Sequence, residues 1–306
     1  MILPKDILKR YWGHSSFRNL QEEIINAVLS KDDVFALLPT GAGKSLCYQI
    51  PALAKEGVCL VISPLISLMK DQIAQLEKKG IKALTIESKS SVEEIVTLFD
   101  NLKFGNYKLL YLSPERLNSE FILNKLKQIQ VNLIAVDEAH CISEWGHDFR
   151  PSYRLIHKVR EIHPDVNIIA LTATATKKVT KDIIENLNLK KTAIFKKSFF
   201  RENLAYQVIQ NENKIGKLEK IFKKNPYPTI IYVGSRRKTE DISNLINLKG
   251  YSSTFYHGGM TSKSKSQAFN SWIKEEKLIM VATNAFGMGI DKSNVKIVVH
   301  LDLPAS

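Results

Sequence analysis

The sequence predicts an α/β protein built from two parallel-sheet domains in tandem. Apolar runs of strand length alternate with longer stretches of helical spacing, and this alternation is typical of βαβ units. Five of the apolar runs end in small or polar clusters, and a second series of runs begins after "FKKSFFREN". We therefore expect one domain at residues 1–200 and another at residues 201–306.

The first domain contains five expected strands, with helical stretches near 67–79 and 91–102 between them. The strands are expected at 34–38, 58–62, 108–112, 133–136 and 168–171. The polar clusters that follow them begin at residues 39, 63, 113, 137 and 172. Because ligands gather beyond the carboxyl ends of parallel strands, these clusters predict a single shared site.

The second domain repeats this architecture without a convincing sequence repeat. Its helices are expected near 217–224, 237–248 and 263–274. Its strands are expected at 204–209, 229–233, 253–256, 278–281 and 297–300.

Composition and charge restrict the classes of function. A net charge of +13 is typical of a protein with a polyanionic partner, and equally of a lysine-rich solvated surface. No run approaches the roughly 18 apolar residues of a membrane span, and the N-terminus lacks a signal-peptide core. The sequence therefore predicts a cytoplasmic protein without a membrane segment, nucleoid-associated if bacterial. The three cysteines lack metal or disulfide spacing, and we expect buried thiols.

The stretch "PTGAGKS" predicts a loop that binds the phosphates of ATP. Two glycines allow the backbone to approach a phosphate closely, and the start of a helix adds positive potential. Lys44 would reach the β and γ phosphates and Ser45 would hold Mg²⁺. The strict pattern has glycine where this chain has Leu38, and an ordinary glycine loop is the alternative. The loop residues are Thr40, Gly41, Ala42, Gly43, Lys44 and Ser45.

An acidic pair follows another expected strand, in "LIAVDEAH". Asp137 is suited to contact Mg²⁺, and Glu138 to polarise an attacking water. Two carboxylates after a strand also occur in helix caps. Together with Lys44 and Ser45, they favour a phosphoryl-transfer site with Lys44, Asp137 and Glu138 as its catalytic residues.

Further motifs resemble those of a known family. "DEAH", "LTATAT", "VISPLISLMKDQ", "YLSPERL" and "VATNAFGMGIDKSNVKIVVHLDLP" occur in the order found in superfamily 2 helicases. "FRNLQEEII" and the aromatic-rich "CISEWGHDFRPSYRLI" are similar to RecQ-type DNA helicases. The resemblance covers essentially the whole chain. It implies two RecA-like domains with ATP between them, and unwinding of DNA in the 3′→5′ direction.

The resemblance also implies residues for nucleotide recognition. Gln21 matches the glutamine that reads adenine, and Arg18 is a second adenine contact. His14 occupies a position at which the family often has tyrosine, and it is expected to stack on the base. Asp291 is expected to contact the nucleotide sugar. Without the resemblance, Gln21 would be interpreted as a surface helix residue.

DNA contacts are implied in both domains, with single strands and duplex junctions as partners. An aromatic ring and a guanidinium are good stacking platforms for unpaired bases, so the aromatic-rich loop is expected to couple DNA binding to hydrolysis. The alternative is that its aromatic side chains belong to the core. The implied contacts are Ser63, Ser113, Arg116, Trp145, His147, Phe149, Arg150, Ser235, His257 and Thr283.

The resemblance stops near the end of the chain. In RecQ-type relatives the next segment carries "GRAGR", which supplies an arginine to the γ-phosphate, and no match occurs up to Ser306. We therefore expect an incomplete second domain and impaired hydrolysis and unwinding. Two alternatives remain open: an ATP-responsive DNA-binding module without unwinding activity, and an RNA helicase of the same superfamily.

Overall fold

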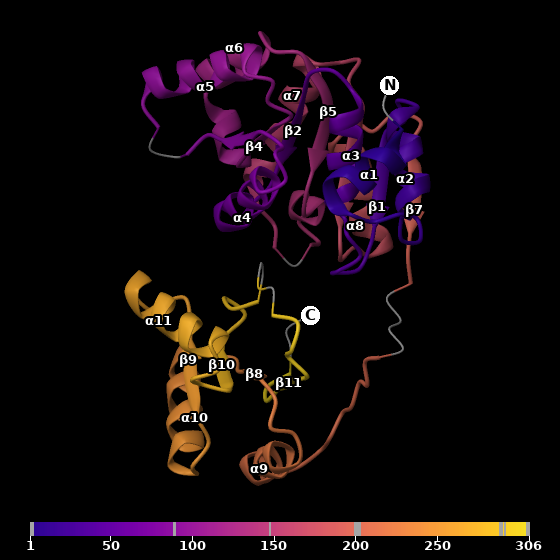
Figure 1. The fold of residues 1–306 in the computed structure, drawn as a ribbon. Helices are drawn as coiled ribbons and strands as arrows, with labels where there is room; N and C mark the ends of the chain where they lie inside the picture. The colour runs from indigo at the N-terminus through magenta and orange to yellow at the C-terminus, as the bar shows by residue number, and fades with distance from the viewer. Residues whose placement is uncertain are drawn as a thin grey trace. The chain divides into compact units, whose positions relative to one another are not determined.

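The chain folds into two compact units, Met1–Glu202 and Asn203–Ser306. A computed structural model describes residues 3–87, 90–146, 148–198, 203–287, 290 and 292–303. Figure 1 shows both units, and each is described by itself.

The first unit is organised around a seven-stranded parallel sheet with the strand order β3-β4-β2-β5-β6-β1-β7. The central strands read as continuous apolar runs because both faces of the sheet are covered, as is usual for parallel sheets. The strands are β1 (Val34–Leu37), β2 (Val58–Ile62), β3 (Ala83–Thr85), β4 (Leu109–Leu112), β5 (Val131–Val136), β6 (Ile168–Thr172) and β7 (Ala193–Lys196).

Alternate residues of these strands enter two separate hydrophobic clusters, one on each face. One face packs against α2 (Gln21–Leu29), α3 (Leu46–Ala54) and α4 (Ile66–Glu77), and α1 (Pro4–Trp12) packs outside α2 and α3. The other face packs against α5 (Val92–Phe104), α6 (Glu120–Leu126), α7 (Ile156–Ile162) and α8 (Lys177–Asn186). Short 3₁₀ helices lie at η1 (Pro114–Asn118), η2 (Ala139–Ile142) and η3 (Pro151–Leu155).

The second unit has a four-stranded parallel sheet with the order β11-β8-β10-β9. Apolar side chains form clusters on both faces of this sheet. Its strands are β8 (Thr229–Tyr232), β9 (Ser253–Tyr256), β10 (Ile279–Ala282) and β11 (Ile297–His300). Its helices are α9 (Lys214–Lys224), α10 (Arg236–Leu248) and α11 (Ser262–Ile273).

The structure confirms the predicted fold class of two α/β parallel-sheet domains. The strand expected at 204–209 is wrong, because residues 204–210 have no regular secondary structure and are exposed. Its apolar and aromatic residues suit a strand, but no described strand pairs with it. Cys47, Cys59 and Cys141 are buried free thiols, as expected. None of the helices in the described ranges is long and apolar enough to cross a membrane.

Candidate functional site

Strand order brings the phosphate loop and the acidic pair to the same edge of the first sheet. The phosphate loop, residues 39–45, follows β1, and Asp137 and Glu138 follow β5. Only β6 lies between β1 and β5, and all three strands run parallel. Two strand spacings place the strand ends roughly 10 Å apart. Backbone hydrogen bonds tie the edge together, since Leu38 N donates to Thr172 O at 3.0 Å.

The phosphate loop has the backbone conformation that its glycines permit. Gly41 and Gly43 adopt φ angles of 79° and 75°, in the left-handed region that favours glycine. At residue 43 an added Cβ would also lie 2.4 Å from Gln21 Nε2. Ser45 is the N-cap of α3, and its side chain makes no capping hydrogen bond. The loop therefore leads directly into a helix N-terminus, which is favourable for a phosphate.

The N-terminal segment contacts the loop through two of the three side chains implied in adenine recognition. Arg18 Nη1 donates to Gly41 O at 2.9 Å, and Gln21 Nε2 donates to Ala42 O and Gly43 O at 3.1 and 3.2 Å. Gln21 is buried, so interpreting it as a plain surface residue is wrong. His14 is exposed and lies in the segment between α1 and Arg18. The structure thus places Arg18 and Gln21 beside the phosphate loop.

Glu138 is held in a strained conformation beside a buried histidine. Its φ angle of 46° is left-handed, which is costly for a residue with a side chain and is frequent at functional sites. His140 Nδ1 lies 3.3 Å from Glu138 Oε2 and 2.8 Å from Thr172 Oγ1. Thr172 Oγ1 in turn accepts a hydrogen bond from Thr174 N at 3.1 Å. Polar contacts therefore run from Glu138 to the end of β6.

Asp137 is buried, and its backbone carbonyl accepts a hydrogen bond from the Tyr153 hydroxyl at 2.8 Å. Burial raises the pKa of Asp137 to about 6 from its ordinary value of 3.8, and the neighbouring Glu138 carboxylate raises it as well. Lys44 and the Glu138 backbone N–H act in the opposite direction. Asp137 and the phosphate-loop lysine are therefore close enough to interact electrostatically.

This raised pKa predicts a pH-dependent stability of the nucleotide-free protein. Between about pH 4 and pH 6 the folded state binds more protons at Asp137 than the unfolded state, so stability falls as pH rises through this window. The free energy of unfolding of the parent should fall by on the order of 2–3 kcal/mol across this window, and Asp137→Asn should abolish that decrease. Urea unfolding at a series of pH values from 4 to 7 measures the free energy of unfolding. Asp165→Asn, at an exposed position, is the control. Parallel curves for the parent and Asp137→Asn would contradict this assignment.

Buried polar side chains also follow β2 and β4 at the same edge. Ser63 follows β2 and Ser113 follows the adjacent β4, and both are buried. Ser63 Oγ and Arg116 Nε and Nη2 are buried without a hydrogen-bond partner in the described part of the chain. Buried polar atoms without partners are rare in proteins, and a hydroxyl and a guanidinium can each donate a hydrogen bond to an anionic oxygen.

The aromatic loop, residues 143–150, begins directly after η2 and therefore close to Glu138. Trp145 is 62% exposed, so interpreting it as a core residue is wrong. Phe149 is partly buried, and Arg154 lies 5.3 Å above its ring. Arg150 Nη1 donates to Pro64 O at 3.1 Å, while Nε and Nη2 donate to Asp148. The loop is thereby tied to the turn after β2.

The second unit has its own strand-end cluster. Ser235, His257 and Thr283 follow β8, β9 and β10, which are adjacent parallel strands. The Ser235 side chain accepts a hydrogen bond from Lys238 N and caps α10. His257 is buried, with Nε2 3.0 Å from Glu240 Oε1 and Nδ1 accepting from Gly259 N. His257 therefore shapes the turn at Gly258 and Gly259. The DNA contacts expected for Ser235, His257 and Thr283 remain predictions.

Two implied site residues, His147 and Asp291, lie outside the described residues. The structure adds His140, Ser143 and Asp182 to the first site. Ser143 Oγ donates to Asp182 Oδ2 at 2.7 Å and accepts from Trp145 N. Nothing in the sequence marks the contact with Asp182, because it joins a loop to a helix far along the chain.

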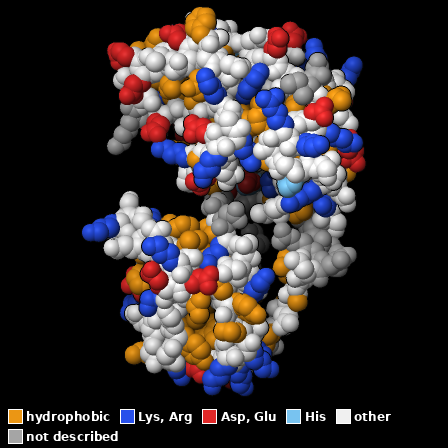
Figure 2. Space-filling model, in the orientation of Figure 1, with side chains coloured by type: hydrophobic (Ala, Val, Ile, Leu, Met, Phe, Trp, Pro, Cys, Tyr) orange, Lys and Arg blue, Asp and Glu red, His pale blue; other side chains and the backbone are white. Residues whose placement is uncertain are grey.

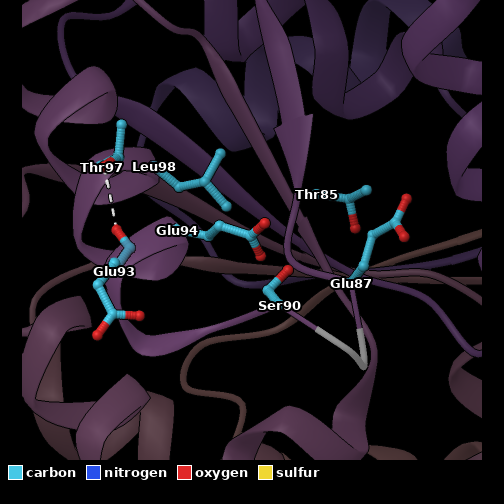
Figure 3. A pocket seen from close by; sticks show the side chains of 7 residues that line it. All are labelled: Thr85, Glu87, Ser90, Glu93, Glu94, Thr97 and Leu98. Atoms are coloured by element: carbon cyan, nitrogen blue, oxygen red, sulfur yellow. Dashed lines mark hydrogen bonds between the residues drawn. The ribbon is translucent and has the colours of Figure 1, made fainter.

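A pocket of about 670 Å³ lies between the end of β3 and the start of α5. Figure 3 shows its acidic lining, with the carboxylates of Glu87 and Glu94 on either side of Ser90. An acidic pocket repels phosphates, so its chemistry does not suit a nucleotide. Positive charge gathers elsewhere, and Figure 2 shows Lys and Arg side chains massed at the lower end of the view over α9.

Comparisons with known proteins agree with this arrangement. Residues 18–183 match the family model for the DEAD/DEAH box helicase, and residues 213–306 match the helicase conserved C-terminal domain. The chain is 44% identical over 303 residues to an ATP-dependent DNA helicase RecQ from Bacillus subtilis, covering 98% of this chain and 51% of that protein. It is 42% identical to a putative ATP-dependent RNA helicase of Acanthamoeba polyphaga mimivirus, covering 98% and 55%. The chain spans about half the length of these relatives.

Solved structures share the fold at low sequence identity. Mss116p bound to ssRNA and AMP-PNP superimposes with a TM-score of 0.75 at 19% identity, covering 98% of this chain and 66% of that one. Dbp5 from S. cerevisiae, bound to RNA and ADP BeF3, gives a TM-score of 0.68 at 16% identity, covering 98% and 78%. The sheets are thus RecA-like. The chain therefore belongs to the DEAD/DEAH box helicase family, and it resembles RecQ-type members along almost its whole length.

Proposed function

We propose that this chain is the motor region of an ATP-dependent DNA helicase that moves 3′→5′ along one strand and unwinds duplex DNA during repair or recombination. One observation carries the proposal. The phosphate loop and the acidic pair flank β6 at one sheet edge, and Thr172 and His140 connect the end of β6 to Glu138. A cytoplasmic protein with this activity would act at the nucleoid in a bacterium.

The residues of the first unit suit ATP and Mg²⁺. The loop backbone and Lys44 would bind the phosphates, Arg18 and Gln21 would contact adenine, and Glu138 would orient the attacking water. No group of three or more His, Cys, Asp or Glu side chains suits a metal among the described residues. Mg²⁺ usually takes one or two protein oxygens and otherwise water and phosphates, which Ser45 and Asp137 fit. When bound, it neutralises phosphate charge.

The unpartnered side-chain groups of Ser63 and Arg116 support binding of a nucleic-acid backbone. Ser63 Oγ and the Arg116 guanidinium offer hydrogen-bond donors to a phosphate without reading base identity. Trp145 presents an exposed ring on which an unpaired base can stack. The net charge of +13 favours the same partner. These contacts suit a single strand lying along the carboxyl edge of the sheet.

The first test is the ATPase activity of the intact protein with and without single-stranded DNA. Lys44→Ala should reduce DNA-stimulated turnover by at least about 100-fold, because it removes a cation aimed at the transferring phosphate. Lys78→Ala, an exposed lysine after α4, is the matched control. Equal activity of the Lys44→Ala variant and the control would refute the site. Unwinding of a duplex with a 3′ tail, compared with a 5′ tail, then tests direction.

An RNA helicase is the second candidate. The relative from mimivirus that is 42% identical carries that name, and Mss116p and Dbp5 were solved with RNA. The aromatic loop, which resembles that of RecQ-type enzymes, favours DNA. ATPase stimulation by equal lengths of ssDNA and ssRNA separates the two, and stronger stimulation by RNA would overturn our choice.

The third candidate is an ATP-responsive DNA-binding module without unwinding activity. It predicts that ATP changes the affinity for single-stranded DNA while forked duplexes stay paired. Helicase activity of the intact protein that depends on Lys44 would exclude it.

A further inference from the structure

Both described aromatic rings of the aromatic loop carry a cation on one face. Lys178 Nζ lies 3.0 Å from the centre of the Trp145 ring, and Arg154 lies 5.3 Å from that of Phe149. The two cations come from different elements, α8 and η3. Cations over aromatic faces are attracted by the ring electrons, most strongly over tryptophan. Trp145 as a whole residue nevertheless remains 62% exposed, which leaves the ring accessible to solvent on the side away from Lys178.

Helix α8 contacts the aromatic loop at two positions one turn apart. Lys178 and Asp182 are separated by four residues and therefore lie on the same face of the helix. Asp182 Oδ2 accepts a hydrogen bond from Ser143 Oγ at 2.7 Å, and the same hydroxyl accepts from Trp145 N at 3.2 Å. The backbone and the ring of Trp145 are thus both fixed relative to α8.

The same helix is joined to the catalytic edge by a short connection. Thr176 caps α8, and Thr172 at the end of β6 lies four residues earlier. Thr172 Oγ1 lies 2.8 Å from His140 Nδ1, which also contacts Glu138. Lys178, in the first turn of α8, therefore lies close to the connection between β6 and α8.

We propose that Lys178 is a positioning residue for Trp145, holding the indole so that an unpaired base stacks on its open face. This inference rests on the proposed function. The ammonium covers one face of the ring and leaves the other to the base, and it gives the stacking platform a positive charge that favours a nucleotide. Lys178 acts through the ring and makes no phosphate contact of its own.

The test measures ATPase activity of the intact protein against the concentration of ssDNA. Lys178→Met keeps the length of the side chain and removes the charge. It should raise the half-maximal DNA concentration about 3- to 30-fold, the range of a cation–π contact. Lys178→Arg should restore it, since a guanidinium also binds an aromatic face. Trp145→Ala should raise it about 5- to 150-fold, the loss of one stacked base.

Lys181→Met is the matched control, because Lys181 is an exposed lysine of the same helix that pairs with Glu185. It should behave like the parent protein. Trp145 emission, isolated as the difference between each protein and its Trp145→Phe counterpart, should change in Lys178→Met and stay constant in Lys181→Met. Urea unfolding of each variant checks that the first unit remains folded.

Two results would overturn the inference. In the first, Lys178→Met matches Lys181→Met in the DNA titration while Trp145→Ala does not. In the second, Lys178→Met lowers the salt dependence of DNA binding by about one counterion without changing Trp145 emission, the result for a direct phosphate contact. Either result leaves the proposed motor in place, whereas normal ATPase activity of Lys44→Ala would refute the motor itself.

Discussion

Replacing Glu138 with glutamine is expected to lower DNA-stimulated ATP turnover by about 100- to 10,000-fold while ATP still binds, the usual effect of losing a general base. Glutamine has the shape of glutamate, so the strained backbone at φ 46° and the contact toward His140 can persist. It cannot accept a proton from water. Steady-state ATPase assays measure turnover, and equilibrium binding of a fluorescent ATP analogue measures affinity.

The control for this substitution is Glu56→Gln. Glu56 is exposed just before β2, at the opposite end of the strands, and should be replaceable without effect. Turnover of Glu138→Gln within about twofold of the control would exclude Glu138 as the base, because a general base contributes at least about 100-fold.

Asp33→Ala should destabilise the first unit by about 3–5 kcal/mol, the usual cost of leaving one member of a buried ion pair alone. Asp33 and Arg160 form a salt bridge and are only 3% and 7% exposed. The Asp33 carboxylate also accepts hydrogen bonds from Ile168 N at 2.7 Å and Lys190 N at 2.6 Å. Urea unfolding followed by circular dichroism measures the change.

A double substitution tests whether the loss of stability in Asp33→Ala comes from the buried Arg160 charge that is left without a partner. Asp33→Ala combined with Arg160→Met removes both charges and should be more stable than Asp33→Ala alone, because no buried cation remains unpaired. Asp165→Ala, at an exposed position before β6, is the control and should change stability by less than about 0.5 kcal/mol. A double variant no more stable than Asp33→Ala would contradict this explanation.

Local patterns were sufficient to predict five of the seven strands of the first sheet and the edge that carries the candidate site, whereas the short strands β3 and β7 were missed. The apolar runs that form β1, β5 and β6 are buried on both faces of the sheet, so the sequence itself marks them. A parallel sheet then brings their ends together without knowledge of the strand order. The glycines of the phosphate loop were equally visible, since only such residues adopt its left-handed angles easily.

Contacts between distant single residues could not be predicted. Asp33 and Arg160 are 127 positions apart, and each alone looks like an ordinary surface charge. Lys178 belongs to a lysine-rich helix, and only the folded chain places it over Trp145. The strand expected at 204–209 failed for a related reason, because an apolar run is compatible with a strand but does not supply the neighbouring strand with which it must pair.

The position of β1 within its sheet affects how the protein is made on the ribosome. β1 is synthesised early, yet its neighbours in the sheet are β6 and β7, which are among the last segments of the first unit. At usual rates of translation, on the order of ten seconds pass between the synthesis of β1 and the synthesis of β6 and β7. During that interval the glycine-rich turn after Leu37 has no sheet to anchor it. A nascent chain should therefore gain ATP affinity abruptly, once Ile168–Thr172 has left the exit tunnel.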